Sequence, residues 1–380
     1  MRIFQVLSAS ATGGINSSKI WLRNLYEPLL DLGHDVCLFR AEEGALARIK
    51  QDTKLRTSFS TKLLDKFKME HSRQPFDLFF AYLMDGMVET GVVDEIRKIG
   101  IPTCNFSCNN THQFDLVDEI SPHFDFNLHS EKDAAQKFRD VGANPVWFPM
   151  GANPKYYHPF DVPRKYDVTF VGQRYALRPF YIWQLLENGV QVNVFGPGWR
   201  LRSEGFLREA LRYFSRLPLA AHAVVSVNSD VRARWSARLA WFDFAERLRL
   251  KYDEYMHPPL SDEDMVRLYS ESLISLGFLD VYDEHDPSAI VKQHLHLRDF
   301  EAPMAGALYL TSFCEELKEF YEPDLEILVY RNEHEMLDKI RYYLKHETEA
   351  QRVRLGGHRR SLNCHTYNRR FQKLFQSINL

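Results

Sequence analysis

The sequence contains no hydrophobic run long enough to cross a membrane as a helix. Its longest mildly apolar stretch, 217–227, includes His222 and is about half of the roughly 20 residues that a membrane span requires. The apolar start at 2–7 turns polar at Ser8, and it is too short for a signal peptide with its cleavage site. We therefore expect a soluble, cytoplasmic protein that attaches at most to the inner face of a membrane.

Cysteine is scarce, with five residues in a chain of 380. The five are Cys37, Cys104, Cys108, Cys314 and Cys364. An odd, scattered set does not make a disulfide framework and fits a reducing compartment. Cys104 and Cys108 are spaced C-x3-C, which is the spacing of neither a zinc knuckle nor a redox pair. We expect ordinary buried thiols.

Strong charge of either sign is also absent. The net charge is −3, so the chain as a whole offers no basic field for nucleic acid. With 45% hydrophobic and 26% charged residues, the composition is that of a folded protein and not of a disordered one. The fingerprint G-x-G-x-x-G is missing as well, which argues against a dinucleotide site of the NAD type. At roughly 150 residues per domain, the length favours two domains.

What the sequence does contain is an alternation of strand and helix signals. A strand at 2–7, a glycine turn and a helix at 16–32 are followed by Gly33, at the position of a helix C-cap, and by a strand at 35–39. This βαβ pattern predicts a parallel, doubly wound sheet. Further strands are expected at 77–84, 102–107, 124–128 and 146–150, and further helices at 88–99 and 131–141. Ser130 is predicted to cap the last of these helices.

A proline-rich connector then divides the chain. Pro154, Pro159 and Pro163 favour an extended linker over packed elements. After the connector the α/β pattern restarts, with strands expected at 166–171, 190–195, 272–278 and 327–330, a helix turn running into a strand at 302–310, and helices at 179–188, 261–270 and 333–345.

These signals predict two α/β domains, 1–160 and 161–364, and a C-terminal helix at 365–380 that packs back on the first domain. Two such domains in tandem are expected to hold a ligand between them, at the carboxyl ends of their strands.

The first candidate site is the turn at 8–16, which contains Gly13, Gly14 and Asn16. Glycines after a first strand let backbone N–H groups approach a phosphate at a helix N-terminus. A plain tight turn would have the same sequence.

The second candidate is the turn at 171–178, which also follows a strand and opens a helix. It contains Gly172, Gln173, Arg174 and Arg178. Arginine suits a diphosphate because its planar fork binds two oxygens, and the helix dipole would help to stabilise a phosphate leaving group. Two solvated arginines are the alternative.

The third candidate is 297–311, in which Glu301 lies at the head of a short apolar helix that ends in glycine and a strand. A carboxylate there can accept two hydroxyl hydrogen bonds, as from a ribose diol. It could equally be an ordinary acid in the first turn of a helix, and spacing alone does not decide between the two.

Taken together, these segments resemble the CgeB-like glycosyltransferases, the family of the spore maturation protein CgeB within the wider GT-B class. The resemblance covers nearly the whole chain except about 200–256 and is strongest from 297 to 371. The residues that carry it are 297–306, 320–324, 335–336, 340–344 and 364–370.

The resemblance implies two Rossmann-like domains that face a cleft. The arginine-rich, mostly helical insert that the sequence itself predicts at about 200–256 lies in the second domain and outside the resemblance. It implies a nucleotide-sugar substrate held mainly by the C-terminal domain, with Arg298 and Glu301 among its ligands, and no metal ion or other cofactor. The acceptor, which is a glycan, a lipid-linked molecule or a protein, would bind on the N-terminal domain.

Individual positions also follow from the resemblance. Glu301 falls where retaining GT-B enzymes hold the donor ribose, and Arg178 where they bind the diphosphate. The glutamate that such enzymes often carry eight positions earlier is replaced by Gln293, which puts the sugar and the retaining label in doubt. His112 lies near the position of a cleft histidine. Glu301, Arg178 and His112 are thus the expected catalytic residues of a retaining glycosyltransferase.

Two other functions share these features. A nucleotide-sugar 2-epimerase can have the same fold, although it would need acid and base carboxylates beside the sugar and Gln293 removes one candidate. A non-catalytic subunit that binds a nucleotide sugar is the other.

Two segments remain open to more than one interpretation. His294 and His296 lack a third ligand at metal-site spacing, so we expect them to line the donor cleft instead. The insert at about 200–256 carries arginines and aromatic residues at helical spacing, including Arg208, Arg212 and Arg216. Such a helix either docks on an anionic membrane or packs on the protein, where it could also serve as a homo-oligomer interface.

Overall fold

The computed structural model describes residues 1–7, 19–40, 45–175, 177–200, 244, 247–282 and 290–380. The chain divides into two compact units. Unit 1 comprises Met1–Asn153 together with His365–Leu380, and unit 2 comprises Pro154–Cys364. The first change of unit falls at Pro154, the start of the proline-rich connector.

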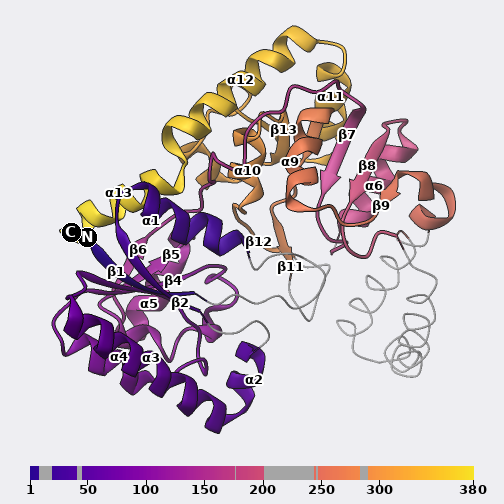
Figure 1. The fold of residues 1–380 in the computed structure, drawn as a ribbon. Helices are drawn as coiled ribbons and strands as arrows, with labels where there is room; N and C mark the ends of the chain where they lie inside the picture. Colours follow the sequence, from indigo (N-terminus) through magenta and orange to yellow (C-terminus); the bar gives the residue numbers. More distant parts are fainter. Residues whose placement is uncertain (8–18, 41–44, 176, 201–243, 245–246, 283–289) are drawn as a thin grey trace, which may run out of the picture. The chain divides into compact units, whose positions relative to one another are not determined.

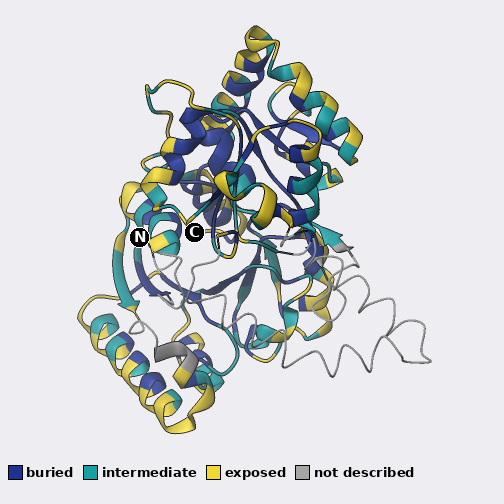
Figure 2. Ribbon diagram, turned by 90° about the vertical axis from the view of Figure 1, so that its right-hand side faces the viewer, coloured by how far each residue is buried: buried dark blue, intermediate teal, exposed yellow. Residues whose placement is uncertain are grey.

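Unit 1 is built on a six-stranded parallel sheet with the order β2-β1-β3-β4-β5-β6. Its strands are β1 (Arg2–Leu7), β2 (Asp35–Arg40), β3 (Leu78–Tyr82), β4 (Thr103–Ser107), β5 (Phe126–His129) and β6 (Pro145–Trp147). Every residue of β3 and β4 is buried, because helices cover both faces of a parallel sheet. The dark strands beneath exposed helices are visible in Figure 2.

The helices of unit 1 are η2 (Leu22–Tyr26), α1 (Glu27–Asp31), α2 (Ala45–Gln51), α3 (Thr53–Arg73), α4 (Thr90–Arg97), α5 (Ala135–Asp140) and α13 (Tyr367–Ser377), with short 3₁₀ turns η3 (Phe114–Leu116), η4 (Ser121–His123) and η5 (Lys132–Ala134). Helices α3 and α4 lie on one face of the sheet, and α1 and α13 on the other (Figure 1). Phe4 and Phe79 pack against Phe67 of α3, whereas Phe80, which points the other way, packs against Phe371 of α13.

The last segment of the chain is an integral part of unit 1. Ala152 pairs with Thr366 in an isolated β-bridge, and Thr366 caps α13 by accepting a hydrogen bond from the backbone of Arg369. The guanidinium of Arg370 donates to the carbonyl of Met150 at 2.9 Å.

Unit 2 contains a second six-stranded parallel sheet, with the order β14-β13-β10-β7-β8-β9. Its strands are β7 (Tyr166–Val171), β8 (Val192–Phe195), β9 (Met256–His257), β10 (Ser272–Leu276), β13 (Tyr309–Ser312) and β14 (Leu328–Tyr330). A separate antiparallel pair, β11 (Asp280–Tyr282) and β12 (Ile290–Gln293), was not expected from the sequence.

The helices of unit 2 are α6 (Arg178–Glu187), α9 (Asp262–Glu271), α10 (Arg298–Met304), α11 (Glu333–Tyr343) and α12 (Glu347–Cys364), with 3₁₀ turns η6 (Asp253–Tyr255) and η7 (Glu315–Glu319). Apolar side chains of α6, α11 and α12 pack on the sheet to form the core of this unit.

One of the two predicted serine caps is present in the structure. Ser261 caps α9 as expected, accepting from the backbone of Asp264 at 3.1 Å. Ser130 caps no helix: the chain forms η5 first, with Glu131 in the cap position, and α5 begins only at Ala135. None of the five cysteines, all of which the structure describes, forms a disulfide; only Cys104 is fully buried, and the other four are half-buried.

Strand β9 begins at Met256, where the expected insert ends, and pairs with β8 in the sheet. Most of the insert, 201–243, and the glycine turn with Gly13, Gly14 and Asn16 lie outside the described residues. Among the helices that the structure describes, none is long and apolar enough to cross a bilayer.

Candidate active site

The strand order of unit 2 creates a cavity at one defined edge of the sheet. From β7 the chain proceeds to β8 on one side and later to β10 on the other. Ligands of open α/β sheets bind at such a reversal, outside the carboxyl ends of the strands. A cavity of about 150 Å³ lies there. It is lined by Phe170, Val171, Gly172, Arg178, Tyr269, Leu276, Gly277, Phe278, His296, Arg298 and Tyr309.

The turn after β7 requires a glycine at position 172. A Cβ on Gly172 would lie 2.7 Å from Cζ of Phe170 and 3.4 Å from a guanidinium nitrogen of Arg178. The carbonyl of Gly172 accepts a hydrogen bond from the indole of Trp199 at 2.7 Å. The turn therefore has a fixed path, and the absence of a side chain leaves room for Arg178 beside it.

Arg178 is the first residue of α6 and lines the cavity. Its guanidinium donates to the carbonyl of Gln173 at 3.1 Å and lies over the rings of Phe170 and Tyr175, 5.4 and 5.5 Å from their centroids. Gln173 is exposed, and Arg174 is half-buried. Of the three polar side chains predicted in this turn, only that of Arg178 lines the cavity.

Glu301 lies in the first turn of α10 and is only 1% exposed. One carboxylate oxygen, Oε2, accepts from Arg298 at 2.5 Å, and the side chain of Arg298 is 35% exposed where it lines the cavity. The other oxygen, Oε1, is buried and has no hydrogen-bond partner among the described residues. Burial and the charge of Glu301 raise the pKa of the neighbouring Tyr157 hydroxyl. The Glu301 carboxylate is thus buried and bonded to Arg298 through one oxygen, with the hydroxyl of Tyr157 beside it.

Asp299, which sequence analysis did not single out, fixes the loop in front of α10. Its carboxylate accepts from the backbone of His296 at 2.7 Å and from the hydroxyl of Thr311 at 3.2 Å. The side chain is fully buried, and burial raises its pKa to about 7. His296 is thereby held at the cavity, and its ring lies 4.4 Å from that of His294, which is buried.

Gln293, at the end of β12, does not line the cavity. Its amide donates to the buried carboxylate of Asp280 at 2.8 Å. The other oxygen of Asp280 accepts from the hydroxyl of Tyr181 at 3.2 Å. Asp280 was also missed from the sequence, because its partner is contributed by the unexpected β11–β12 pair.

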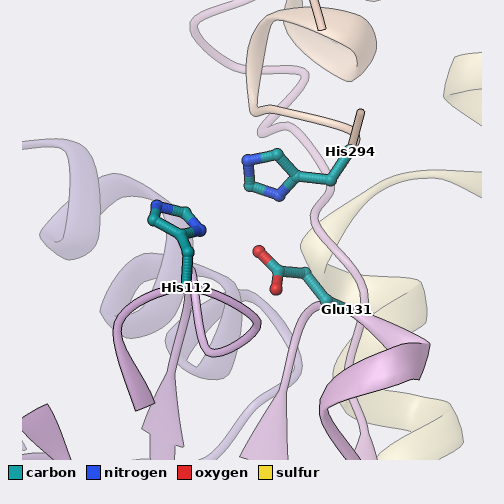
Figure 3. Close-up of side chains that lie close together, drawn as sticks. All are labelled: His112, Glu131 and His294. Carbon is teal, nitrogen blue, oxygen red and sulfur yellow. The ribbon is translucent and has the colours of Figure 1, made fainter. Parts of the chain in front are cut away.

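In unit 1, His112 lies in the turn after β4 and is exposed. The side chain of Glu131, which follows β5, points toward it (Figure 3), and a ring nitrogen of His112 and a carboxylate oxygen of Glu131 lie within 4.8 Å of each other. These two strands are neighbours in the sheet, so their carboxyl ends bring the two side chains together.

The sequence also matches a known family. A model of the glycosyl transferase-like family matches residues 178–376, more than half of the chain. The chain belongs to the glycosyl transferase-like family. A search of curated proteins finds no match.

Solved structures similar to this glycosyltransferase include three that cover its whole length. Sucrose-phosphate synthase from Thermosynechococcus elongatus has 12% identity and a TM-score of 0.60, covering 99% of this chain and 98% of its own. Anabaena HepE in complex with UDP-glucose has 10% identity and a TM-score of 0.60, covering 100% and 99%. A Listeria monocytogenes protein assigned as a UDP-N-acetylglucosamine 2-epimerase has 11% identity and a TM-score of 0.50, covering 100% and 96%.

At such low identity these likenesses show the fold. It is the GT-B fold, with two Rossmann-like domains of parallel sheet, so the predicted fold class is confirmed for both units of this glycosyltransferase. Within unit 2, the structure brings Gly172, Arg178 and Arg298 to one cavity, with Glu301 bonded to Arg298 behind it.

Proposed function

We propose that this glycosyltransferase takes its sugar from a nucleotide-sugar donor bound at the cavity of unit 2. One observation supports this above the others. Oε1 of Glu301 is buried without a hydrogen-bond partner among the described residues, next to an arginine-lined cavity at the strand-order reversal. A buried acceptor left unsatisfied costs roughly 1–3 kcal/mol, and the hydroxyls of a ribose would satisfy it.

We assign the diphosphate to Arg178, with Arg174 and Arg298 as neighbouring cations. A positive side chain at a helix N-terminus opposes the helix dipole. A bound diphosphate would offset this unfavourable interaction, because its negative charge would be attracted by both the arginine and the N-terminus of α6. The backbone at Gly172 and Gln173 would approach the phosphates closely. As the donor splits, the same groups would stabilise the charge that develops on the departing diphosphate.

The resemblance to CgeB-like enzymes supports transfer with retention of configuration and without a metal ion. In a front-face reaction, the leaving phosphate itself takes the proton of the acceptor hydroxyl, so no protein nucleophile is needed. Gln293, which was also expected to bind the donor, would act from outside the cavity through its hydrogen bond to Asp280. We assign His112 of unit 1 to the acceptor side, where its ring would hydrogen-bond the reacting hydroxyls.

UDP-glucose is the first donor to test, because HepE has been solved with it. Calorimetric titration of the wild type with UDP-glucose, UDP and other nucleotide sugars should give saturable binding for a subset of them. If no nucleotide sugar binds, the proposed donor site is wrong.

Two alternatives can be separated by product analysis. A 2-epimerase, an activity assigned to the similar Listeria protein, would convert its nucleotide sugar with no acceptor present. A non-catalytic subunit would bind the donor tightly and turn over no acceptor. Transfer to an added glycan, lipid-linked or protein acceptor, without conversion of the donor alone, would support our proposal.

We further propose that the chain acts in the cytoplasm, and that its arginine-rich segment serves either as a membrane contact or as an interface between copies. Arginines near an anionic surface contribute about 1 kcal/mol each. Co-sedimentation with anionic vesicles at low and high salt, alongside the mass of the protein in solution, distinguishes the two.

A further inference from the structure

The carboxylate of Glu131 is an unusual feature of unit 1. It is 2% exposed, although an isolated buried charge costs several kcal/mol unless it is hydrogen-bonded. It occupies the cap position of η5, yet its side chain makes no cap hydrogen bond there. The side chain instead crosses to the turn after the neighbouring strand β4.

In that turn, Glu131 holds the residue before His112. Its Oε2 accepts from the backbone N–H of Thr111 at 2.7 Å and also from the hydroxyl of Thr111. The carbonyl of Thr111 accepts from Lys137 of α5 at 2.6 Å. Thr111 is therefore fixed on both sides of its backbone by charged groups, and such bonds are the stronger kind.

The remainder of the turn is also held by local hydrogen bonds. Asn109 adopts a positive φ of 62°, its carbonyl accepts from the backbone of Gln113 at 2.9 Å, and the side chains of Asn110 and Ser107 hydrogen-bond each other. His112 is thus an exposed imidazole on a turn held by several hydrogen bonds, with the buried carboxylate of Glu131 within 4.8 Å of its ring (Figure 3).

We propose that Glu131 is the positioning residue of His112. It holds the turn through Thr111 and places a negative charge beside the imidazole, which favours one ring orientation and one tautomer. The consequence for transfer rests on the proposed acceptor-side role of His112. A displacement of about 1 Å in a positioned group can lower a rate roughly 100-fold. Loss of the Glu131 contacts should therefore lower the turnover rate and leave the affinity for the donor unchanged.

The experiment uses the full-length protein and the variants Glu131→Gln, His112→Gln and their double. Glutamine keeps an oxygen that can accept from the Thr111 backbone, so the turn retains one bond while the charge is lost. Glu70→Gln is the matched control: Glu70 is a carboxylate of unit 1 paired with Lys66 at 2.7 Å and with Arg2, which is at the start of β1. Melting temperatures identify any variant that fails to fold.

Two measurements decide the matter. Ring ¹⁵N chemical shifts of His112, assigned as the resonances missing in His112→Gln, should change in Glu131→Gln and not in Glu70→Gln. Release of UDP from UDP-glucose, with water accepting the glucosyl group, should show a kcat lowered roughly 10- to 100-fold in Glu131→Gln with an unchanged KM. The double variant should be no slower than His112→Gln alone, because groups that act through each other are not additive.

Unchanged His112 ring shifts in Glu131→Gln would overturn the proposal, as would rate losses that multiply in the double variant. If His112→Gln alone leaves the rate intact, the acceptor-side role of His112 is refuted. The ring shifts would then still report whether Glu131 holds the imidazole.

Discussion

Replacing Glu301 with alanine removes a carboxylate whose two oxygens have different surroundings. Oε2 is bonded to Arg298 at 2.5 Å, and Oε1 has no partner among the described residues. If Oε1 accepts hydroxyls of the donor ribose, the variant loses hydrogen bonds to a charged acceptor, which contribute roughly 1.5–3 kcal/mol. The dissociation constant of the donor should then rise roughly 10- to 150-fold.

The measurement is calorimetric titration with UDP-glucose, together with the melting temperature of each variant. Some loss of stability is expected, but Arg298 is partly exposed and can turn to solvent. Glu271→Ala is the matched control. Glu271 is also a buried carboxylate of unit 2, paired with Lys165 at 2.6 Å, and it does not line the cavity.

The control should lose stability and keep its donor affinity. A folded Glu301→Ala protein that binds UDP-glucose as tightly as the wild type would refute the assignment of the ribose. An equal loss of affinity in Glu271→Ala would show that instability alone explains the effect.

Three further results are expected. Gly172→Ala should weaken donor binding at least tenfold, because its Cβ would lie 2.7 Å from Phe170. The control Gly91→Ala in α4, whose Cβ would meet nothing within 4 Å, should instead stabilise the fold by up to about 1 kcal/mol. If the two variants bind the donor equally well, the close approach of the donor to the Gly172 turn is contradicted. Burial raises the pKa of Asp299 to about 7, so the folded state binds this proton more tightly than the unfolded state and the free energy of unfolding should fall as pH rises from about 4 to 7. In Asp299→Asn, whose side chain is neutral throughout, the free energy of unfolding measured in urea should fall by up to about 4 kcal/mol less over this pH range. If the variant shows the same fall as the wild type, Asp299 is not its source. Transfer should persist after dialysis against EDTA, because arginines supply the positive charge at the proposed diphosphate site; activity lost to EDTA and restored by one divalent ion would refute metal independence.

The alternation of elements was predictable because it depends on local pattern. Continuous apolar runs between glycine turns indicated parallel strands, and the structure has them in two sheets. The turn with Gly172 and Arg178 could be identified for the same reason, since it combines a strand end, a glycine and a helix start within a few residues.

The missed residues depend on distant partners. Asp299 looks like any first-turn acid. Only the burial of α10 raises its pKa, and only the distant hydroxyl of Thr311 helps to hold its carboxylate in place. Asp280 is bonded by Gln293 from the other strand of an antiparallel pair. Glu131 is bonded by Thr111, which lies in the turn after the neighbouring strand β4. In each case the acid is an ordinary residue in its own segment, and its surroundings depend on a second segment that is distant in the sequence.

The return of the C-terminal segment to unit 1 has a consequence for how this protein is made. Phe371 covers Phe80 and Phe148, and Arg370 holds the carbonyl of Met150, so residues 1–153 alone would leave an apolar face open to water. The ribosome supplies the missing helix only after all of unit 2 has been translated. A nascent first domain therefore stays incomplete until α13 has been synthesised, and a message truncated before α13 would yield a chain with both sheets encoded and one of them uncovered.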